Sequence, residues 1–257
     1  MACILKDFHK VCQSLARNEA KMLQIERFNQ IRELLEKTPT LRIGQIAQVL
    51  YVSEATVRRD VDAMEKNGLL KRVYGGVTLN KEEMPLDLRS FQHADKKDEI
   101  GKQAAQLVKD GQTIFIDSSS TALHMLPYIK HKKDVTIISN SQKIIDTLAF
   151  TDNKLILTGG ELIPRNLAYV GELACRSLDM YRPELVFFSS QGIDVNGEIT
   201  DVSQTETALR RAAIKRGIKA VFLCDSSKAG KIYPHHVCYK SEISEIITDS
   251  DFPREYL

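Results

Sequence analysis

Several features that would narrow the function of a chain are missing from this sequence. It has no tryptophan, and no two of its cysteines form a Cys-x-x-Cys pair. The five cysteines are Cys3, Cys12, Cys175, Cys224 and Cys238. Because the number is odd and the positions are scattered, a complete intrachain disulfide framework is excluded, and we expect reduced buried thiols.

Long apolar runs are also missing. No uninterrupted stretch is long enough to cross a bilayer. Near the N-terminus, charged and polar residues (Lys6, Asp7, His9, Lys10) stand where a signal peptide has its apolar core. We therefore expect a cytoplasmic protein.

The chain lacks a strong excess of either charge. Its 36 Lys and Arg residues face 34 Asp and Glu residues, a formal net charge of +2. Any contact with nucleic acid must therefore come from local charge. Between residues 41 and 76, six basic side chains face four acidic ones. A symmetric assembly doubles such a modest excess, so we expect a homodimer or homotetramer.

The clearest pattern lies between Tyr51 and Leu79. Ser53 is a good helix N-cap, because its hydroxyl can accept from free backbone N–H groups of the first turn. Apolar residues follow at helical spacing (Val57, Val61, Met64), with Arg58, Arg59 and Asp60 predicted on the solvent side. Gly68 is typical of a helix end. Leu69 to Leu79 predicts a hairpin with a Gly75-Gly76 turn.

Residues 43–50 form a short amphipathic pattern just upstream, so the segment predicts a helix-turn-helix followed by a basic β-wing. In such proteins the start of the second helix enters the major groove of double-stranded DNA. We expect base contacts from Glu54, Ala55, Thr56 and Arg58, and phosphate contacts from Ser53, Arg59, Lys71 and Arg72. A winged helix used for protein contacts is the alternative.

The stretch VSEATVRRDVDAMEKNGLLKRVYGG closely resembles the N-terminal signature of the DeoR family of bacterial transcription regulators. The match is long and gapless, with Val61 and Met64 where the family usually has leucine. The family's usual opening corresponds to Met22 onward. Two interpretations stay open for residues 1–21: Met22 is the true start, or these residues form an added N-terminal helix.

Residues 22–79 are thus predicted as a winged helix-turn-helix DNA-binding domain, opening with a helix that ends near Thr38-Pro39. Residues 80–95 are polar, contain a proline and predict a linker. Arg89 falls near an arginine that many family members carry.

From residue 96 onward, short apolar runs alternate with helical patterns. This alternation predicts a Rossmann-like α/β domain with a largely parallel sheet over residues 96–257. The expected strands are Thr113–Ile116, Val135–Ile138, Lys154–Leu157, Leu185–Phe188, Ala220–Leu223 and Ile243–Ile247, with helices over Ala122–Ile129, Gln142–Ala149 and Glu206–Arg216.

Small, polar or charged residues follow five of these strands. Ligands of open α/β sheets bind at the carboxyl ends of the strands, so these residues predict a pocket for a small polar anion. Hydroxyls and free N–H groups at a helix start can hold phosphate, and Lys228 can neutralise it. The candidates are Asp117, Ser118, Ser119, Ser120, Thr121, Ser139, Asn140, Gly159, Gly160 and Lys228.

These loops also resemble the sensor domain of the DeoR family. The matching positions are Asp117–Thr121, Ser139–Ser141, Gly159-Gly160, Gly192–Asp194, Gly197–Thr200, Glu206, Asp225–Lys228 and Ile247–Asp249. The resemblance implies a fold related to ribose-5-phosphate isomerase and a phosphorylated sugar or polyol as effector, with hydroxyls bound by Asp117 and Glu206. One departure is Ser119, where the family has glycine.

The resemblance implies a repressor of a sugar-metabolism operon rather than an enzyme, with no cofactor. The rival interpretation is a sugar-phosphate isomerase that uses Glu206 or Asp117 as base and Lys228 to polarise the carbonyl. A metal site at His235, His236 and Cys238 lacks the further ligands that structural zinc requires, so none is predicted.

Overall fold

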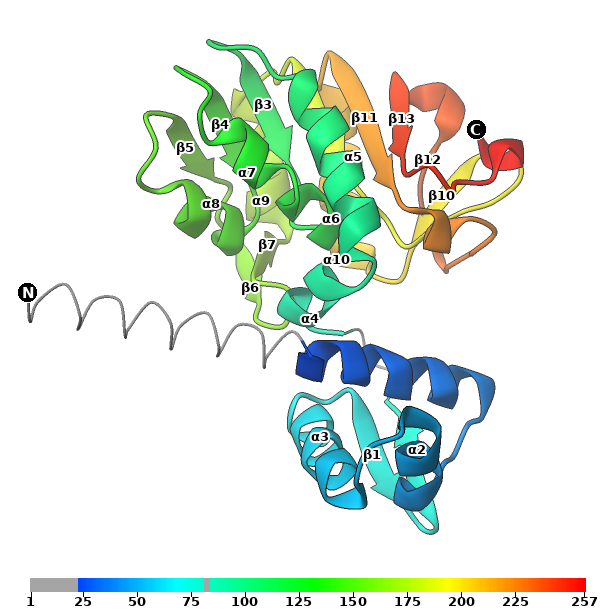
Figure 1. The fold of residues 1–257 in the computed structure, drawn as a ribbon. Helices are drawn as coiled ribbons and strands as arrows, with labels where there is room; N and C mark the ends of the chain where they lie inside the picture. The colour runs from blue at the N-terminus through cyan, green and yellow to red at the C-terminus, as the bar shows by residue number, and fades with distance from the viewer. Residues whose placement is uncertain (1–22, 81–83) are drawn as a thin grey trace, which may run out of the picture. The chain divides into compact units, whose positions relative to one another are not determined.

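The computed structural model describes residues 23–80 and 84–257. The chain divides into two compact units, one ending at Gln92 and the other beginning at His93 (Figure 1). The expectation for residues 1–21, and for Met22 as the start, lies outside the described residues. Within the described residues, no helix is long and apolar enough to cross a membrane.

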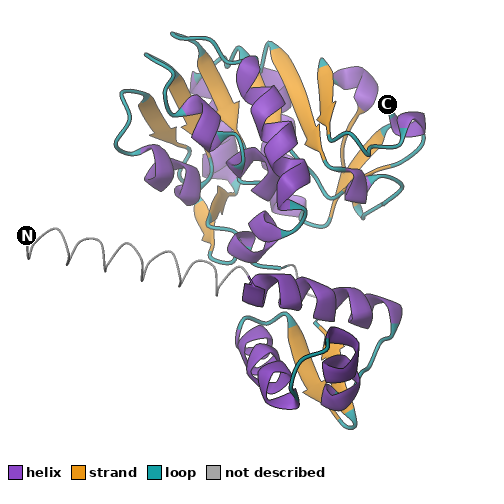
Figure 2. Cartoon of the chain, in the orientation of Figure 1, coloured by secondary structure: helices purple, strands orange, loops and turns teal. Residues whose placement is uncertain are grey.

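The N-terminal unit is a helical cluster with a two-stranded wing (Figure 2). A helix over residues 23–37 precedes α2 (Ile43–Leu50) and α3 (Glu54–Lys66), and the wing is β1 (Leu70–Val73) and β2 (Gly76–Leu79). The predicted N-cap of α3 is confirmed, because the Thr56 backbone N–H donates to Ser53 Oγ over 3.1 Å. The apolar positions predicted for α3, Val57, Val61 and Met64, lie in the core of the unit, together with Phe28, Ile31 and Leu35 of the first helix and Ile46 of α2.

The wing differs from its prediction by one residue. Val73 pairs with Gly76, so the turn is Tyr74-Gly75 rather than Gly75-Gly76. Gly76 has a different purpose. A Cβ atom there would lie 2.3 Å from the Leu41 carbonyl oxygen. Leu41 exchanges two backbone hydrogen bonds with Val77, so glycine lets the segment before α2 lie against the wing.

Asp60 was predicted on the solvent side of α3, and the structure shows that this is wrong. The residue is 1% exposed and forms a bidentate ion pair with Arg27, with Nε–Oδ2 at 2.6 Å and Nη2–Oδ1 at 3.0 Å. Its spacing from Val57 and Met64 places it on the buried face. The partner is 33 residues away, so spacing within α3 could not reveal it.

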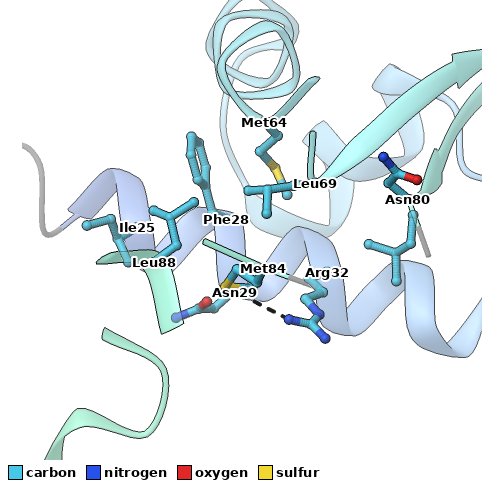
Figure 3. A pocket seen from close by; sticks show the side chains of 10 residues that line it. Ile25, Phe28, Asn29, Arg32, Met64, Leu69, Asn80, Met84 and Leu88 are labelled. Carbon is cyan, nitrogen blue, oxygen red and sulfur yellow. Dashed lines mark hydrogen bonds between the residues drawn. The ribbon is translucent and has the colours of Figure 1, made fainter. Parts of the chain in front are cut away.

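The segment predicted as a linker is partly structured. Residues Leu86–Phe91 form helix α4, and Met84 packs into the core of the N-terminal unit. Figure 3 shows Met84 and Leu88 lining a cavity of about 50 Å³ together with Phe28 and Met64. Arg32 reaches the Met84 sulfur at 3.9 Å. The segment carries apolar residues at alternate positions (Met84, Leu86, Leu88). Three such residues were too few to predict a structured segment, because its other residues are mostly polar.

The C-terminal unit is built on a six-stranded parallel sheet, as predicted. Its strand order is β13-β11-β8-β3-β4-β5. The strands are β3 (Thr113–Ile116), β4 (Thr136–Ser139), β5 (Lys154–Leu157), β8 (Leu185–Phe188), β11 (Lys219–Cys224) and β13 (Glu245–Thr248). All predicted strands are present, with ends shifted by at most two residues.

Helices bury both faces of this sheet. Ile114 and Ile116 of β3 pack in one cluster, and Phe115 between them packs in the other. The first cluster includes residues of α5 (Ala94–Gln106), α6 (Ser120–Leu123), α7 (Leu126–Ile129) and α8 (Gln142–Leu148). The second includes residues of α9 (Glu172–Ser177) and α10 (Gln204–Arg216). This alternation is what a fully covered parallel sheet requires.

The helix predicted over Ala122–Ile129 is two short helices. Pro127 stands at the start of α7, and its ring is incompatible with a continuous helix through residue 123. Short strands were not predicted: a hairpin of β6 (Glu161–Ile163) and β7 (Ala168–Val170), and an antiparallel sheet of β9 (Gly192–Ile193), β10 (Glu198–Asp201) and β12 (His235–Tyr239). Four 3-10 turns complete the unit: Leu178–Met180, Ser226–Lys228, Lys240–Glu242 and Arg254–Tyr256.

Candidate nucleic-acid interface and anion site

Helix α3 exposes most of the residues predicted to meet DNA. Ser53, Glu54, Ala55, Arg58 and Arg59 are exposed, and Thr56 is half-buried. The Ser53 and Thr56 hydroxyls lie 2.9 Å apart and share a hydrogen bond. The start of α3 therefore presents short polar side chains together with two long basic ones.

The arginines of α3 are held only by weak surface contacts. Arg58 Nη2 donates to Glu54 Oε2 over 3.0 Å, with both side chains more than half exposed. Arg59 Nε donates to the Ala55 carbonyl over 3.4 Å. An exposed pair of this kind contributes little to stability, so either guanidinium can turn toward a phosphate or a base at small cost.

The two wing residues predicted to bind phosphate differ in their surroundings. Arg72 is paired with Asp62 and with Glu65, whose Oε2 lies 3.1 Å from Nε. These pairs link β1 to α3 and give Arg72 a structural role that the sequence did not suggest. Lys71 is exposed, and no acidic residue of the described chain pairs with it, so its charge is available to DNA.

In the C-terminal unit, the loop after β3 is organised by Asp117. Its Oδ1 accepts from the Ser119 backbone N–H at 3.1 Å and from Ser119 Oγ at 2.5 Å. Its Oδ2 accepts from the Ser189 backbone N–H at 3.2 Å and from Arg210 Nε at 2.9 Å. Both oxygens thus accept hydrogen bonds from the protein, and these contacts hold the loop; the contact of Asp117 with a sugar hydroxyl stays a prediction.

Ser119, the departure from the family glycine, has an ordinary backbone with φ of −74°. Its hydroxyl donates to Asp117 and accepts from the Ala122 backbone N–H at 3.2 Å, which caps α6. The extra side chain therefore faces the loop itself, and glycine is not required at this position.

A buried cluster of charges forms one half of the site. Arg210 of α10, which the sequence analysis missed, is 5% exposed. Its guanidinium lies 2.9 Å from Asp117 and 2.9 Å from Asp201, and 3.8 Å from Glu206. Burial opposes its charge, but Asp201, Asp117 and Glu206 together raise the pKa of Arg210. Three carboxylates around one guanidinium leave this half acidic.

The opposite half is basic. Lys228 Nζ donates to Ser189 Oγ at 2.6 Å and to Thr121 Oγ1 at 3.2 Å, and lies 3.5 Å from Asp225 Oδ2. Lys97 of α5, a second residue that was missed, is 4% exposed and donates to Ser120 Oγ at 3.1 Å. Burial would raise the pKa of Asp225, but Lys228, with Ser227 and Lys97, holds it well below its usual range.

Asn140, after β4, carries an unsatisfied acceptor. Its Nδ2 donates to the Tyr169 carbonyl and to Ser118 Oγ, each at 3.2 Å. Its Oδ1 is buried, and no donor within the described residues reaches it. Buried acceptors are nearly always paired, so this atom marks a place for a ligand donor. Nearby, Glu206 accepts from Asn166 Nδ2 at 3.1 Å and from Ser118 Oγ at 3.4 Å.

Two further candidates, Ser139 and Gly160, have structural explanations. Ser139 accepts from the Ser141 backbone N–H at 3.0 Å. A Cβ atom on Gly160 would lie 2.4 Å from the Val170 carbonyl oxygen. Glycine at this position therefore lets the backbone pack closely against β7. Cys224 ends β11 and is fully buried, and burial raises its pKa.

The histidine pair on β12 forms no metal centre in the structure. His236 Nδ1 lies 2.9 Å from Glu198 Oε1, and burial raises the pKa of Cys238 to about 12. Across residues 23–80 and 84–257, no three His, Cys, Asp or Glu side chains are grouped to hold a metal ion.

The exposed helix-turn-helix with its basic wing defines a DNA-binding transcription regulator. Residues 27–83 match the DeoR-like helix-turn-helix domain, and residues 92–250 match the DeoR C-terminal sensor domain. The chain therefore belongs to the DeoR family of transcriptional regulators, as its signature indicated.

Relatives span nearly the whole chain. An uncharacterised helix-turn-helix regulator, YulB of Bacillus subtilis, is 33% identical over 236 residues, covering 89% of this chain and 90% of its own length. The regulator GolR of Listeria innocua is 32% identical, covering 89% and 92%. The lactose phosphotransferase system repressor of Staphylococcus epidermidis is 30% identical, covering 90% and 94%.

Solved structures include a D-ribose-5-phosphate isomerase in complex with phospho-erythronic acid, with a TM-score of 0.41 and 12% identity over 53% of this chain and 54% of that chain. A likeness of this size bears on neither the ligand nor the reaction.

Proposed function

We propose that this regulator is a repressor of a sugar-metabolism operon and that a phosphorylated sugar or polyol controls its binding to operator DNA. Family membership supports DNA binding, and a relative of similar length is named a lactose phosphotransferase system repressor. The exposed arginines of α3 and the free charge of Lys71 supply the DNA contacts.

The division of the anion site into two halves carries the proposal for the effector. Lys97 and Lys228 flank hydroxyls of the loop after β3, where a phosphate gains charge-assisted hydrogen bonds. The acidic half, with Glu206 and the unsatisfied Asn140 Oδ1, suits a partner that donates hydroxyls. A molecule with a phosphate at one end and hydroxyls at the other matches both halves.

The isomerase alternative is less well supported. An isomerase needs a carboxylate free to remove a proton from carbon. Both oxygens of Asp117 accept hydrogen bonds from the protein, and Glu206 lies 3.8 Å from Arg210 and accepts from Asn166, contacts that tie it to the cluster. Reversible binding uses the same groups without requiring a free base.

Control of DNA binding requires that the effector bind one state of the protein more tightly than another. We propose that the relevant states differ in the geometry of paired reading heads in a homodimer or homotetramer, since one head carries only a modest positive charge. Ligand and DNA then affect each other's affinity by equal factors.

A panel of sugar phosphates, polyol phosphates and the corresponding free sugars tests the effector class by thermal stabilisation. A ligand that binds only the folded state raises the melting temperature; at 100 times its Kd it adds about 2.7 kcal/mol. We expect stabilisation by a phosphorylated compound and none by its free sugar. Release of operator DNA by the same compound would identify it as an inducer.

Lys228→Ala and the exposed Lys215→Ala form the matched pair of variants for this test. Lys228→Ala is expected to repress normally and to ignore the inducer, whereas Lys215→Ala responds as the wild type does. Normal induction of Lys228→Ala would remove this lysine from the site. The absence of stabilisation by any compound, in protein that still binds DNA, would refute the sugar-phosphate proposal.

A further inference from the structure

The first turn of α5 connects three loops at the carboxyl edge of the sheet. Lys97 Nζ contacts Ser120 after β3, at 3.1 Å. Its neighbour Lys96 donates to Ser226 after β11, at 2.7 Å, and lies 3.5 Å from Asp249 after β13. One helical turn therefore contacts two loops of the anion site, those after β3 and β11, and the neighbouring loop after β13.

This turn is also the first structure after the boundary between the two units. The N-terminal unit ends at Gln92 and the other begins at His93, which is the N-cap of α5. The Lys97 backbone N–H donates to the His93 carbonyl at 3.0 Å and closes the turn. His93 has left-handed backbone angles, with φ of 51°, a conformation that fixes the direction in which the chain enters α5.

The charges of the anion site act on this boundary residue. Burial lowers the pKa of His93, while Asp225 acts to raise it and Lys97 and Lys96 to lower it further. Asp225 is the carboxylate that lies 3.5 Å from Lys228, and Lys97 also lowers its pKa. Asp225 thus lies in the field of both lysines, and a bound dianion would change the balance of charge around the start of α5.

We propose that Lys97 is a second phosphate-binding lysine of the effector site and that the effector reaches the unit boundary through it. Lys228 holds the phosphate from the loop after β11, and Lys97 holds it from α5. Phosphate bound to Lys97 fixes the first turn of α5 and therefore the chain direction at His93. This inference rests on the proposed effector site and adds the residue through which ligand binding acts on the linker.

The first measurement compares binding of inorganic phosphate by thermal stabilisation, against chloride at equal ionic strength, in the full-length protein. The variants are Lys97→Gln, Lys228→Gln and the matched control Lys102→Gln, an exposed lysine of the same helix. Losing a charged hydrogen-bond donor is expected to weaken phosphate binding about tenfold or more in the first two variants. The control binds as the wild type does.

The second measurement is hydrogen exchange at the amides of residues 93–100, with and without saturating phosphate. We expect phosphate to slow exchange in the wild type, in Lys102→Gln and, once phosphate is raised to saturation, in Lys228→Gln. Lys97→Gln at its own saturation should gain no such protection. Lys97→Met, which keeps the length of the side chain, replaces Lys97→Gln if the latter does not fold.

The possible failures are distinct. If Lys97→Gln binds phosphate as Lys102→Gln does, or gains the same protection at residues 93–100, the role of Lys97 is overturned while the effector site stands. If phosphate and the sugar phosphates stabilise neither the wild type nor the control, the proposed effector class is overturned and this inference falls with it.

Discussion

The two units hold their arginines in opposite ways. In the N-terminal unit, the Arg58 side chain is 64% exposed and its partner Glu54 is 55% exposed. In the C-terminal unit, the Arg210 side chain is 6% exposed and its partner Asp117 is 1% exposed. Exposed pairs contribute about 0–1 kcal/mol and exchange partners easily, whereas removing one member of a buried pair leaves an uncompensated charge.

This difference corresponds to what each surface has to do. A DNA-reading surface must exchange its internal partners for phosphates and bases on each binding event. The proposed effector site would have to keep its shape while empty, so that a small ligand does not have to organise it. Arg27–Asp60 differs from the other ion pairs described in the N-terminal unit, since Asp60 is buried, and it fixes the buried face of α3 rather than its exposed face.

Removing the buried guanidinium is expected to have the largest effect. Arg210→Met should lower the free energy of unfolding by about 3–5 kcal/mol, because Asp117 and Asp201 then lie buried without a counter-charge. Urea denaturation measures this change. The exposed neighbour provides the control, since Arg211→Met should change stability by less than about 0.5 kcal/mol. Equal stability of the two variants would contradict the contrast between the units.

Removing an exposed guanidinium of the reading helix should affect DNA binding without affecting stability. Arg58→Ala is expected to weaken binding to an operator selected in vitro by about 1–3 kcal/mol, while stability changes by less than about 0.5 kcal/mol. Fluorescence anisotropy measures the affinity. Arg176→Ala removes a similar surface pair with Glu172 in α9 and should leave DNA binding unchanged. Loss of both DNA and effector binding in Arg58→Ala would refute the division of roles between the units.

The smallest effect is expected at the wing. Arg72→Gln breaks surface pairs with Asp62 and Glu65 and should lower stability by less than about 1 kcal/mol, and less still at high salt. The salt dependence of DNA binding distinguishes a structural role from a phosphate contact. Lys71→Gln should reduce the slope of the logarithm of the binding constant against the logarithm of the salt concentration by about one, as loss of a phosphate contact does. An equal reduction of this slope in Arg72→Gln would show that Arg72 contacts phosphate, as the sequence predicted.

Local signals in the sequence were sufficient for α3 and for the six strands of the parallel sheet. Ser53 caps α3 through a contact three residues away, and the apolar runs of the central strands β3, β4, β8 and β11 are buried on both faces. Two of the failures arose where a distant partner decides the outcome. Asp60 is buried because Arg27, from another helix, neutralises it. Residues 84–91 pack because Phe28 and Met64 offer an apolar surface.

The candidate site shows the same division. The loops after β3, β4 and β11 were found because polar residues follow apolar strands. Arg210 and Lys97 were missed because both lie inside helices that otherwise appear solvent-exposed in sequence. In α10, Arg210 and Arg211 are indistinguishable by type, and only the fold places one among Asp117, Asp201 and Glu206. To predict Arg210 and Lys97 as site residues, one would need to know which distant segments of the chain lie together in the fold.

Cys224 offers a way to time the opening of the C-terminal unit. This thiol ends β11, and its burial, which raises its pKa, keeps it protonated and out of reach of reagents. Alkylation requires a thiolate, so it can proceed only in molecules whose sheet has transiently opened. The rate of labelling therefore reports the population of open molecules. The native Cys224 thiol can thus report how often the parallel sheet opens, without any engineered probe.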